Sequence, residues 1–404
     1  MSSEIVRFVH TADFHLEVPL FGVAYLPTEL RSLFRSAAQQ AARRVFDVAI
    51  EEKVDFVILA GDIIQPSSSG VAAAARLREQ FERLDEAGIP IYWLSGRVDE
   101  KGRWPKSVLL PENVHRFVAG QADIVTYSID GNEVVHIIGV GHGIELDDAL
   151  ELVPDDDEIP VIVVAHGRIS KQVRSQAEQA TYWALGGKHR ATPIECDSTA
   201  WYAGTNQGRS PREGDSHGCL VVELTLDGSV QVEKVPTDVA RFRQEHFFVP
   251  PEAGQNDLRK LLTERERELA RRFPDQSLLV TWELEGPNRL ARQWSQSEVV
   301  QDALDSLNGN KKANKPNIWH LGIEWSPTFD WTKEEGEQET LLAEFIHMVA
   351  LYDQDESLPL PWETLLKEEQ QTTIAGLLVE VDNRSELLSQ VAELGRQLLT
   401  PETP

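Results

Sequence analysis

Carboxylates and imidazoles follow apolar segments at several places in the first half of the chain. Asp13 and His15 come after the first apolar run, Asp62 after the second, and His166 and His189 after two later runs. In open α/β sheets, binding sites form outside the carboxyl ends of the strands, so these five side chains are expected to converge. Carboxylate and imidazole ligands together suit manganese, iron or zinc, and a cation offsets the cost of crowding carboxylates.

Each of these residues also has a purely structural interpretation. Asp13, His15 and Asp62 could form turns or cap loops, although such a role does not account well for all three together. His166 and His189 could be buried core histidines, and this alternative competes most strongly for His166.

A scaffold that brings strand ends together is indicated by the apolar pattern. Short apolar runs bounded by Gly, Asp or Pro predict strands over Ile5–His10, Val54–Ala60, Pro90–Leu94, Val134–Val140, Pro160–Ala165 and Tyr182–Leu185. Helical patterns over 32–52 and 71–87 alternate with the first strands, which predicts a layered α/β fold. Two further apolar runs, 220–226 and 230–235, flank Asp227-Gly228 and predict a hairpin.

The pattern changes after about residue 245. A helix over 256–273, a strand over 277–284, a helix over 298–307 and a strand over 317–325 predict a small α+β unit. We therefore expect three parts, namely 1–240, 245–330 and an acidic helical segment over 331–404. An apolar stripe at helical spacing in the last part either packs on the protein's own core, which we favour, or binds a partner. The stripe consists of Leu387, Leu388, Val391, Leu394 and Leu398.

Composition limits the classes of partner. The chain has 404 residues and a net charge of −27, which argues against non-specific nucleic-acid binding by a broad basic surface. A local basic cleft is still compatible with this charge. No apolar run approaches the roughly 20 residues needed to cross a bilayer, so no membrane association is expected. Cys196 and Cys219 form no metal or redox motif. They either form a single disulfide or, as we favour, are reduced thiols of a cytoplasmic protein.

The order of the motifs resembles that of the calcineurin-like metallophosphoesterases. Asp-x-His, Gly-Asp, His-Gly and a final Gly-x-x-His stand in the family's order, with Gly96-Arg97-Val98-Asp99 in the place of its Gly-Asn-His-Asp. Four later segments are similar to the SbcD/Mre branch of DNA-repair nucleases: Tyr182–Gly186, Tyr202–Gln207, Glu213-Gly214 and Gly218–Val221. The resemblance covers about 1–240. That branch carries a capping domain over the part that corresponds to 245–325, and its members attach to a coiled-coil ATPase of the SbcC/Rad kind near 338–399.

This resemblance implies a fold and a ligand set. The fold would be a β-sandwich flanked by helices, in four αββα layers, with a small α+β capping domain and a C-terminal helical segment. Asp13, His15, Asp62 and His189 would hold a first ion, and a second ion would share Asp62 and take His166. The metal would be Mn²⁺, with Fe or Zn as other candidates.

Three family positions are altered in this chain. The second ion would also need an Asn and a His at the positions of Arg97 and Gly187, so one ion is expected to bind and not two. The His that protonates the leaving oxygen is replaced by Val98, while its orienting partner Asp99 remains, so no general acid is assigned. Arg97 could pair with Asp62 or Asp99, which we favour, or bind phosphate bidentately. Arg209 lies in a polar loop that either faces DNA or, as we favour, is simply solvated.

Three functions follow as hypotheses. The first is an SbcD-like DNA-repair nuclease subunit that hydrolyses phosphodiesters with impaired efficiency. The second is a non-catalytic pseudo-nuclease scaffold that works with a coiled-coil, SMC-like ATPase. The third is a small-molecule phosphoesterase. The resemblance also implies DNA and a second copy of the chain as partners.

Overall fold

The computed structural model describes most of the chain up to residue 326. The described residues are 5–23, 26–64, 66–99, 104–117, 120–141, 143–154, 159–250, 252–274, 276–285, 297–309, 318–326, 345, 348–352, 388 and 391. Most of the predicted acidic helical segment, including three of the five stripe residues, therefore lies outside them. The chain divides into two compact units, one formed by 1–244, 272–280 and 311–321 and the other by 245–271, 281–310 and 322–404.

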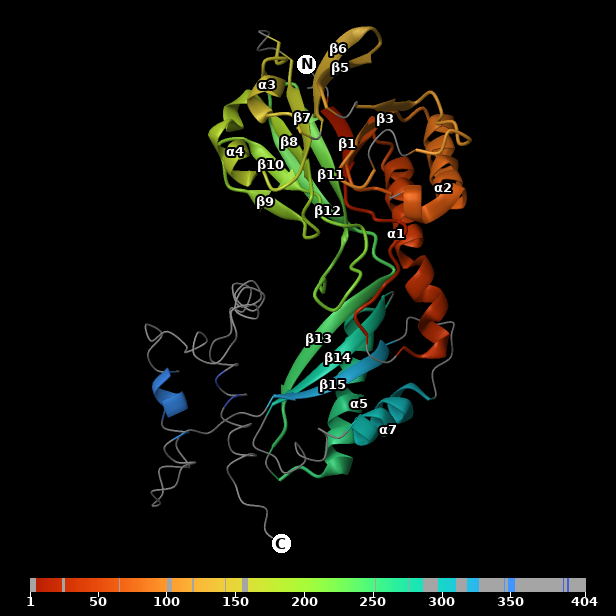
Figure 1. Cartoon of the computed structure of the whole chain (residues 1–404), viewed down its shortest axis with the longest axis vertical. Coiled ribbons are helices and arrows are strands. Elements are labelled where there is room, and N and C mark those ends of the chain that lie inside the picture. The colour runs from red at the N-terminus through yellow and green to blue at the C-terminus, as the bar shows by residue number, and fades with distance from the viewer. Residues whose placement is uncertain are drawn as a thin grey trace, which may run out of the picture. The chain divides into compact units, whose positions relative to one another are not determined.

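The first unit contains two six-stranded sheets (Figure 1). One has the order β12-β11-β1-β2-β3-β4, and its strands are β1 Ile5–Thr11, β2 Phe56–Ala60, β3 Ile91–Leu94, β4 Val114–Arg116, β11 Gly218–Thr225 and β12 Val230–Pro236. Strands β1 to β4 run parallel, so their carboxyl ends share one edge. The predicted hairpin is confirmed, because β11 and β12 pair antiparallel around Asp227-Gly228.

The second sheet has the order β5-β6-β7-β8-β10-β9. Its strands are β5 Ala122–Ile129, β6 Asn132–Val140, β7 Val161–His166, β8 Tyr182–Gly186, β9 Thr192–Ile194 and β10 Thr199–Tyr202. Strands β6, β7, β8 and β10 are parallel to one another. The carboxyl ends of β7 and β8 bring His166 and the segment that leads to His189 to the same edge.

The two sheets pack face to face and are covered by helices on their outer sides. Phe8, Phe56 and Tyr92 of the first sheet share a core with Ile162 and Tyr182 of the second. Helices α1 (Arg31–Glu51) and α2 (Pro66–Glu86) pack on the outer face of the first sheet, and α3 (Leu146–Leu150) and α4 (Ser170–Ser175) pack on the outer face of the second. This arrangement confirms the predicted αββα layers (Figure 1).

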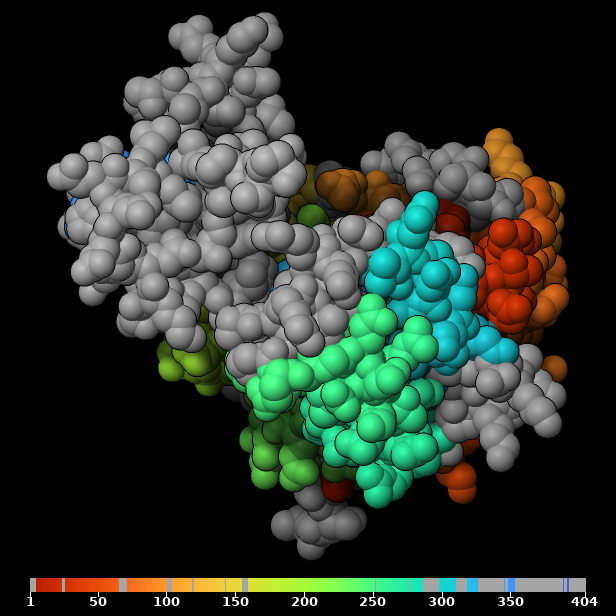
Figure 2. Space-filling model, turned by 90° about the horizontal axis from the view of Figure 1, so that it is seen from below, coloured from red at the N-terminus to blue at the C-terminus, as the bar shows by residue number. Residues whose placement is uncertain are grey.

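A third sheet has the order β13-β14-β15 and is formed by β13 Ala240–Phe248, β14 Ser277–Glu285 and β15 Ile318–Ser326. Two helices, α5 (Gln255–Arg272) and α7 (Ser297–Asn308), lie side by side (Figures 1 and 2). Helices α5 and α7 and strands β14 and β15 agree within one residue with the helices and strands expected for the α+β unit, whereas β13 was not predicted. The domain boundaries expected from the sequence remain a prediction.

Several elements were not predicted. Strands β4 and β9 have three residues each, which is too short to give a pattern. Strand β5 is half-buried along almost its whole length, so it lacks the apolar run of a core strand. Both cysteines are free, as expected, and no described helix is long and apolar enough to span a membrane.

Candidate metal centre

The loops that follow β1 and β2 run side by side and carry three of the candidate ligands. The amide of Asp13 donates to the carbonyl of Gly61 (2.9 Å), and the amide of His15 donates to the carbonyl of Asp62 (3.1 Å). Asp13, His15 and Asp62 have positive φ values of 54°, 44° and 55°, a conformation adopted by only six non-glycine residues in the described part of the chain. Because this backbone is strained for residues with a Cβ, such positions concentrate at functional sites.

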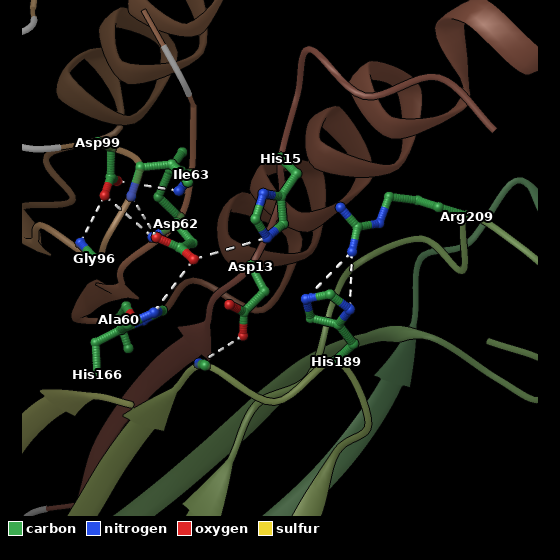
Figure 3. Close-up of polar contacts among 12 residues, drawn as sticks. Asp13, His15, Ala60, Asp62, Ile63, Gly96, Asp99, His166, His189 and Arg209 are labelled. Atoms are coloured by element: carbon green, nitrogen blue, oxygen red, sulfur yellow. Dashed lines mark hydrogen bonds and ion pairs between the residues drawn. The ribbon is translucent and has the colours of Figure 1, made fainter. Parts of the chain in front are cut away.

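Five side chains form two overlapping groups with the spacing of metal ligands. One group is Asp13, His15 and His189, and the other is Asp13, Asp62 and His166. In each group, one nitrogen or oxygen of every residue lies within 4.8 Å of the others. The structure thus brings all five predicted ligands together (Figure 3). Asp13 is common to both groups, whereas the resemblance implied Asp62 as the shared ligand.

Asp62 and His166 form an ion pair inside the cluster. Oδ2 of Asp62 lies 3.3 Å from Nε2 of His166. Burial alone would raise the pKa of Asp62, but the hydrogen bond from His166 and the amide of Val98 (2.9 Å) hold it well below its usual range. Burial opposes the charged form of His166, yet Asp62 and Asp13 raise its pKa to about 9. Nδ1 of His166 lies 2.8 Å from the carbonyl oxygen of Ala60, which fixes the ring so that Nε2 faces the carboxylate.

Two buried atoms of the cluster have no hydrogen-bond partner among the described residues. They are Oδ1 of Asp13 and Nε2 of His15. Asp13 is fully buried, and its other oxygen accepts a hydrogen bond from the amide of Gly187 (2.8 Å). Burial raises the pKa of Asp13 to about 6 and lowers the pKa of His15 to about 4. An unsatisfied buried polar atom costs about 1–3 kcal/mol, and a divalent cation would satisfy both of these, so the residues fit a bound metal.

Glu213 orients His189, a role that sequence reasoning missed. Oε1 of Glu213 lies 2.6 Å from Nδ1 of His189. Metal-binding histidines commonly donate their second ring N–H to a carboxylate. The other ring nitrogen of His189, Nε2, lies 3.3 Å from the guanidinium of Arg209. Burial alone would raise the pKa of Glu213, but His189 and Arg209 lower it to about 2. The sequence offered only the family-like pair Glu213-Gly214, with no role attached to it.

Arg209 is buried beside this pair, so the expectation of a solvated loop was wrong. Its side chain lies 3.3 Å from Glu213 and 2.9 Å from Nδ1 of His189. Nδ1 of His189 donates its proton to Glu213. Arg209 therefore contributes as a cation that pairs with the Glu213 carboxylate, and its guanidinium lies next to the His189 ring (Figure 3). Its charge also contributes to the lowered pKa of His15, after burial.

Comparisons with known proteins agree with this geometry. Residues 6–191 match the model of the calcineurin-like phosphoesterase family. This region is a calcineurin-like metallophosphoesterase domain. It contains all five clustered ligands, whereas Glu213 lies beyond the matched residues.

Two curated relatives extend the comparison beyond the metallophosphoesterase domain. An uncharacterized metallophosphoesterase, YhaO of Bacillus subtilis, is 28% identical over 56% of this chain and 59% of its own length. The DNA double-strand break repair protein Mre11 of Haloferax volcanii is 27% identical over 70% of this chain and 62% of its own length. The chain therefore spans about three fifths of these relatives. A dimetal phosphatase from Danio rerio has a TM-score of only 0.34 at 12% identity, with 57% of this chain and 98% of that chain covered.

The altered loop of the metallophosphoesterase domain keeps its backbone role. Asp99 accepts hydrogen bonds from the amides of Gly96, Asp62 and Ile63 and from the indole of Trp93. These four donors occupy the carboxylate and tie the loop after β3 to the loop after β2. Asp99 therefore supports the backbone that carries Asp62, and this structural role does not depend on a histidine at residue 98.

Arg97 does not fill the altered site in the way that we favoured from the sequence. Its side chain is exposed, and it forms no hydrogen bond or ion pair with Asp62 or Asp99. The carboxylate of Asp62 contacts the amide of Val98, the imidazole of His166 and, at 3.9 Å, Nε2 of His15. The alternative, that Arg97 contacts a phosphate, stays a prediction.

Gly187 stands where the family has a histidine, and the backbone leaves no room for a side chain there. Its φ is +96°, and a Cβ would lie 2.8 Å from the nitrogen and 3.0 Å from the Cα of Gly167. The amide of Gly167 is itself held by the carbonyl of Gly186 (3.0 Å). A ligand cannot be restored at residue 187 without a backbone shift, which supports the expectation of a single ion.

Removal of the charge on Glu213 should weaken metal binding. We expect Glu213→Gln to lower the affinity for Mn²⁺ about 10–100-fold, because an outer-shell carboxylate fixes the orientation and basicity of a histidine ligand. Isothermal titration of EDTA-treated protein with MnCl₂ measures this. Asp215→Asn is the control, since Asp215 is exposed and pairs with the exposed Arg190. Equal affinities of Glu213→Gln and wild type would contradict the role of Glu213.

A methyl group at residue 187 should destabilise the domain. Gly187→Ala is expected to cost about 2–4 kcal/mol, from left-handed strain of about 1 kcal/mol plus overlap with Gly167. Gly120→Ala separates the two terms, because Gly120 has a φ of +79° with nothing within 4 Å of its Cβ position. Urea unfolding of both variants gives the difference. Equal losses would show that residue 187 has more room than the structure indicates.

Proposed function

We propose that this chain hydrolyses phosphodiester bonds of DNA with the help of one bound Mn²⁺ ion, as a DNA-repair nuclease of the SbcD/Mre type. The observation that carries the proposal is the convergence of Asp13, His15, Asp62, His166 and His189 at the carboxyl ends of the strands, three of them on positive-φ backbone. Two atoms of this cluster are buried without a hydrogen-bond partner among the described residues, as expected for ligands of a cation.

The protein groups define what the site could contribute to hydrolysis. A divalent ion bound there would supply Lewis-acid polarisation of a phosphoryl oxygen. Asp62 stays ionised at neutral pH, and the lowered pKa of His15 keeps its imidazole neutral, so both are in the protonation state of a ligand. Val98 has no proton to give, so the leaving oxygen would take its proton from solvent, and the contribution of about 10²–10⁴-fold that a general acid makes would be missing.

The choice of DNA as substrate rests on the relatives. The Haloferax volcanii relative is named as a double-strand break repair protein, and it aligns with 70% of this chain. The resemblance to the SbcD/Mre branch implies a coiled-coil ATPase and a second copy of the chain as partners, and both remain predictions. The metal is proposed as Mn²⁺ because mixed carboxylate and imidazole ligands suit it, with Fe or Zn as alternatives.

A non-catalytic scaffold is the second candidate, and a specific observation favours it. Gly187 cannot carry the family's second-ion ligand without a backbone shift, and Arg97 and Val98 replace two further active-site residues. Meanwhile Asp99 preserves the loop itself through four hydrogen bonds. A protein that keeps the fold and one ion but no turnover would show this pattern.

Metal content and cleavage together separate the two candidates. The EDTA-treated chain is titrated with MnCl₂, its metal is measured by elemental analysis, and cleavage of a linear DNA duplex is assayed. We expect about one ion per chain and Mn²⁺-dependent cleavage. Asp62→Asn should reduce cleavage more than about 100-fold, because loss of an outer partner alone costs about 10–100-fold.

Asp130→Asn is the matched control for this variant. Asp130 also has a positive φ, 51°, but it lies in an exposed turn away from the cluster. Metal binding without cleavage by the wild type would favour the scaffold. Absence of metal binding would overturn both candidates.

A further inference from the structure

A pocket of about 400 Å³ adjoins the metal centre and is unusually basic for this protein. It shares Gly187 and His189 with the centre, and four cationic residues line it: Arg168, Lys188, Arg190 and Arg212. The volume lies within the range of about 300–1,000 Å³ that is usual for ligand sites. In a chain with 39 basic and 66 acidic residues, such a concentration of positive charge indicates a place for an anion.

The acidic residues of the pocket pair with only one of these four cations, Arg190. Glu213 is engaged by His189 (2.6 Å) and Arg209 (3.3 Å). Asp215 pairs with Arg190 (2.6 Å). Arg168, Lys188 and Arg212 are then left without a carboxylate partner among the residues that the structure describes.

Lys188 is held in place by uncharged groups. Its ammonium donates to the hydroxyl of Ser170 (3.2 Å) and lies 4.2 Å from the centre of the Tyr202 ring. Tyr202 is fully buried, and its hydroxyl donates to the carbonyl of Gly167 (3.0 Å). A lysine that is ordered in this way loses less side-chain entropy when it binds an anion, and its charge is not cancelled by an acid.

The position of Lys188 connects the pocket to the metal centre. It is flanked by Gly187, whose amide donates to Asp13, and by His189, a candidate ligand. No aromatic side chain other than histidine lines the pocket in the described part of the chain, so no platform for stacking a base is provided there. The pocket therefore offers contacts for a phosphate group and not for a nucleobase.

We propose that this pocket binds a second phosphate of the substrate, with Lys188 as its main contact and Arg168 and Arg212 as supporting contacts. The inference rests on the proposed function and narrows it: the substrate is a nucleic-acid strand with at least two phosphates, read without regard to base sequence, and not a small molecule with one phosphodiester. The protein thus holds the strand by its backbone beside the scissile bond.

Binding without metal tests this proposal independently of catalysis. The probe is a fluorescein-labelled oligothymidylate of 12 nucleotides. It is titrated with the EDTA-treated full chain at several salt concentrations, and binding is followed by fluorescence anisotropy. We expect Lys188→Gln to weaken binding and to lower the slope of log K against log salt by about 0.7, the value for one phosphate contact on a single strand. Lys188→Arg should retain binding.

Lys171→Gln is the matched control, because Lys171 is an exposed residue of the neighbouring helix α4 and does not line the pocket. Thermal melting of each variant shows whether it folds. Equal affinity and slope for Lys188→Gln and wild type would overturn the inference, as would oligothymidylate that binds no better than inorganic phosphate. Intact oligothymidylate binding by a wild type that cleaves nothing with Mn²⁺ would instead count against the proposed hydrolysis and leave the pocket assignment supported.

Discussion

Close backbone packing around the Asp62 carboxylate is the constraint on which the rest of the site depends. A Cβ at Gly96 would lie 2.4 Å from Oδ1 of Asp62, and a Cβ at Gly61 would lie 2.6 Å from Nδ1 of His166. A Cβ at Gly186 would meet the carbonyl of Ala60. Strand ends from both sheets can therefore approach closely enough to place ligands around one point only because glycine stands at these positions. The strained φ of Asp62 is held by the same packing.

This constraint explains why some family positions could change while others are kept. Asp99 receives four N–H donors and would leave them unsatisfied if it were lost, which is costly in a buried loop. Arg97 is exposed and Val98 contributes its amide to Asp62, so neither side chain is needed to hold the loop. Residues 97 and 98 can thus vary in chemistry without loss of the fold. The positions of the metal ligands therefore do not depend on the side chains at residues 97 and 98, where the family has active-site residues.

The sequence predicted what depends on local pattern and missed what depends on tertiary contact. Buried runs such as those of β1, β2 and β8 were found because apolar residues bounded by Gly or Asp mark core strands, and their ends carried the ligands. The contact between Glu213 and His189 joins residues 24 positions apart, and no spacing rule indicates it. The burial of Arg209 and the exposure of Arg97 likewise depend on how loops pack, so both were assigned the wrong environment.

Net charge is an incomplete guide to partners. The value of −27 counts every residue equally, and −12 of it belongs to residues 331–404. At physiological ionic strength, charges on an exposed surface are screened beyond roughly 8 Å, so a phosphate near the metal centre responds mainly to the groups beside it. Those groups include Arg168, Lys188 and Arg212, while Glu213 and Asp215 are already paired. An acidic protein can therefore hold a polyanion if its cations are concentrated at the site and its nearby carboxylates are engaged by other partners.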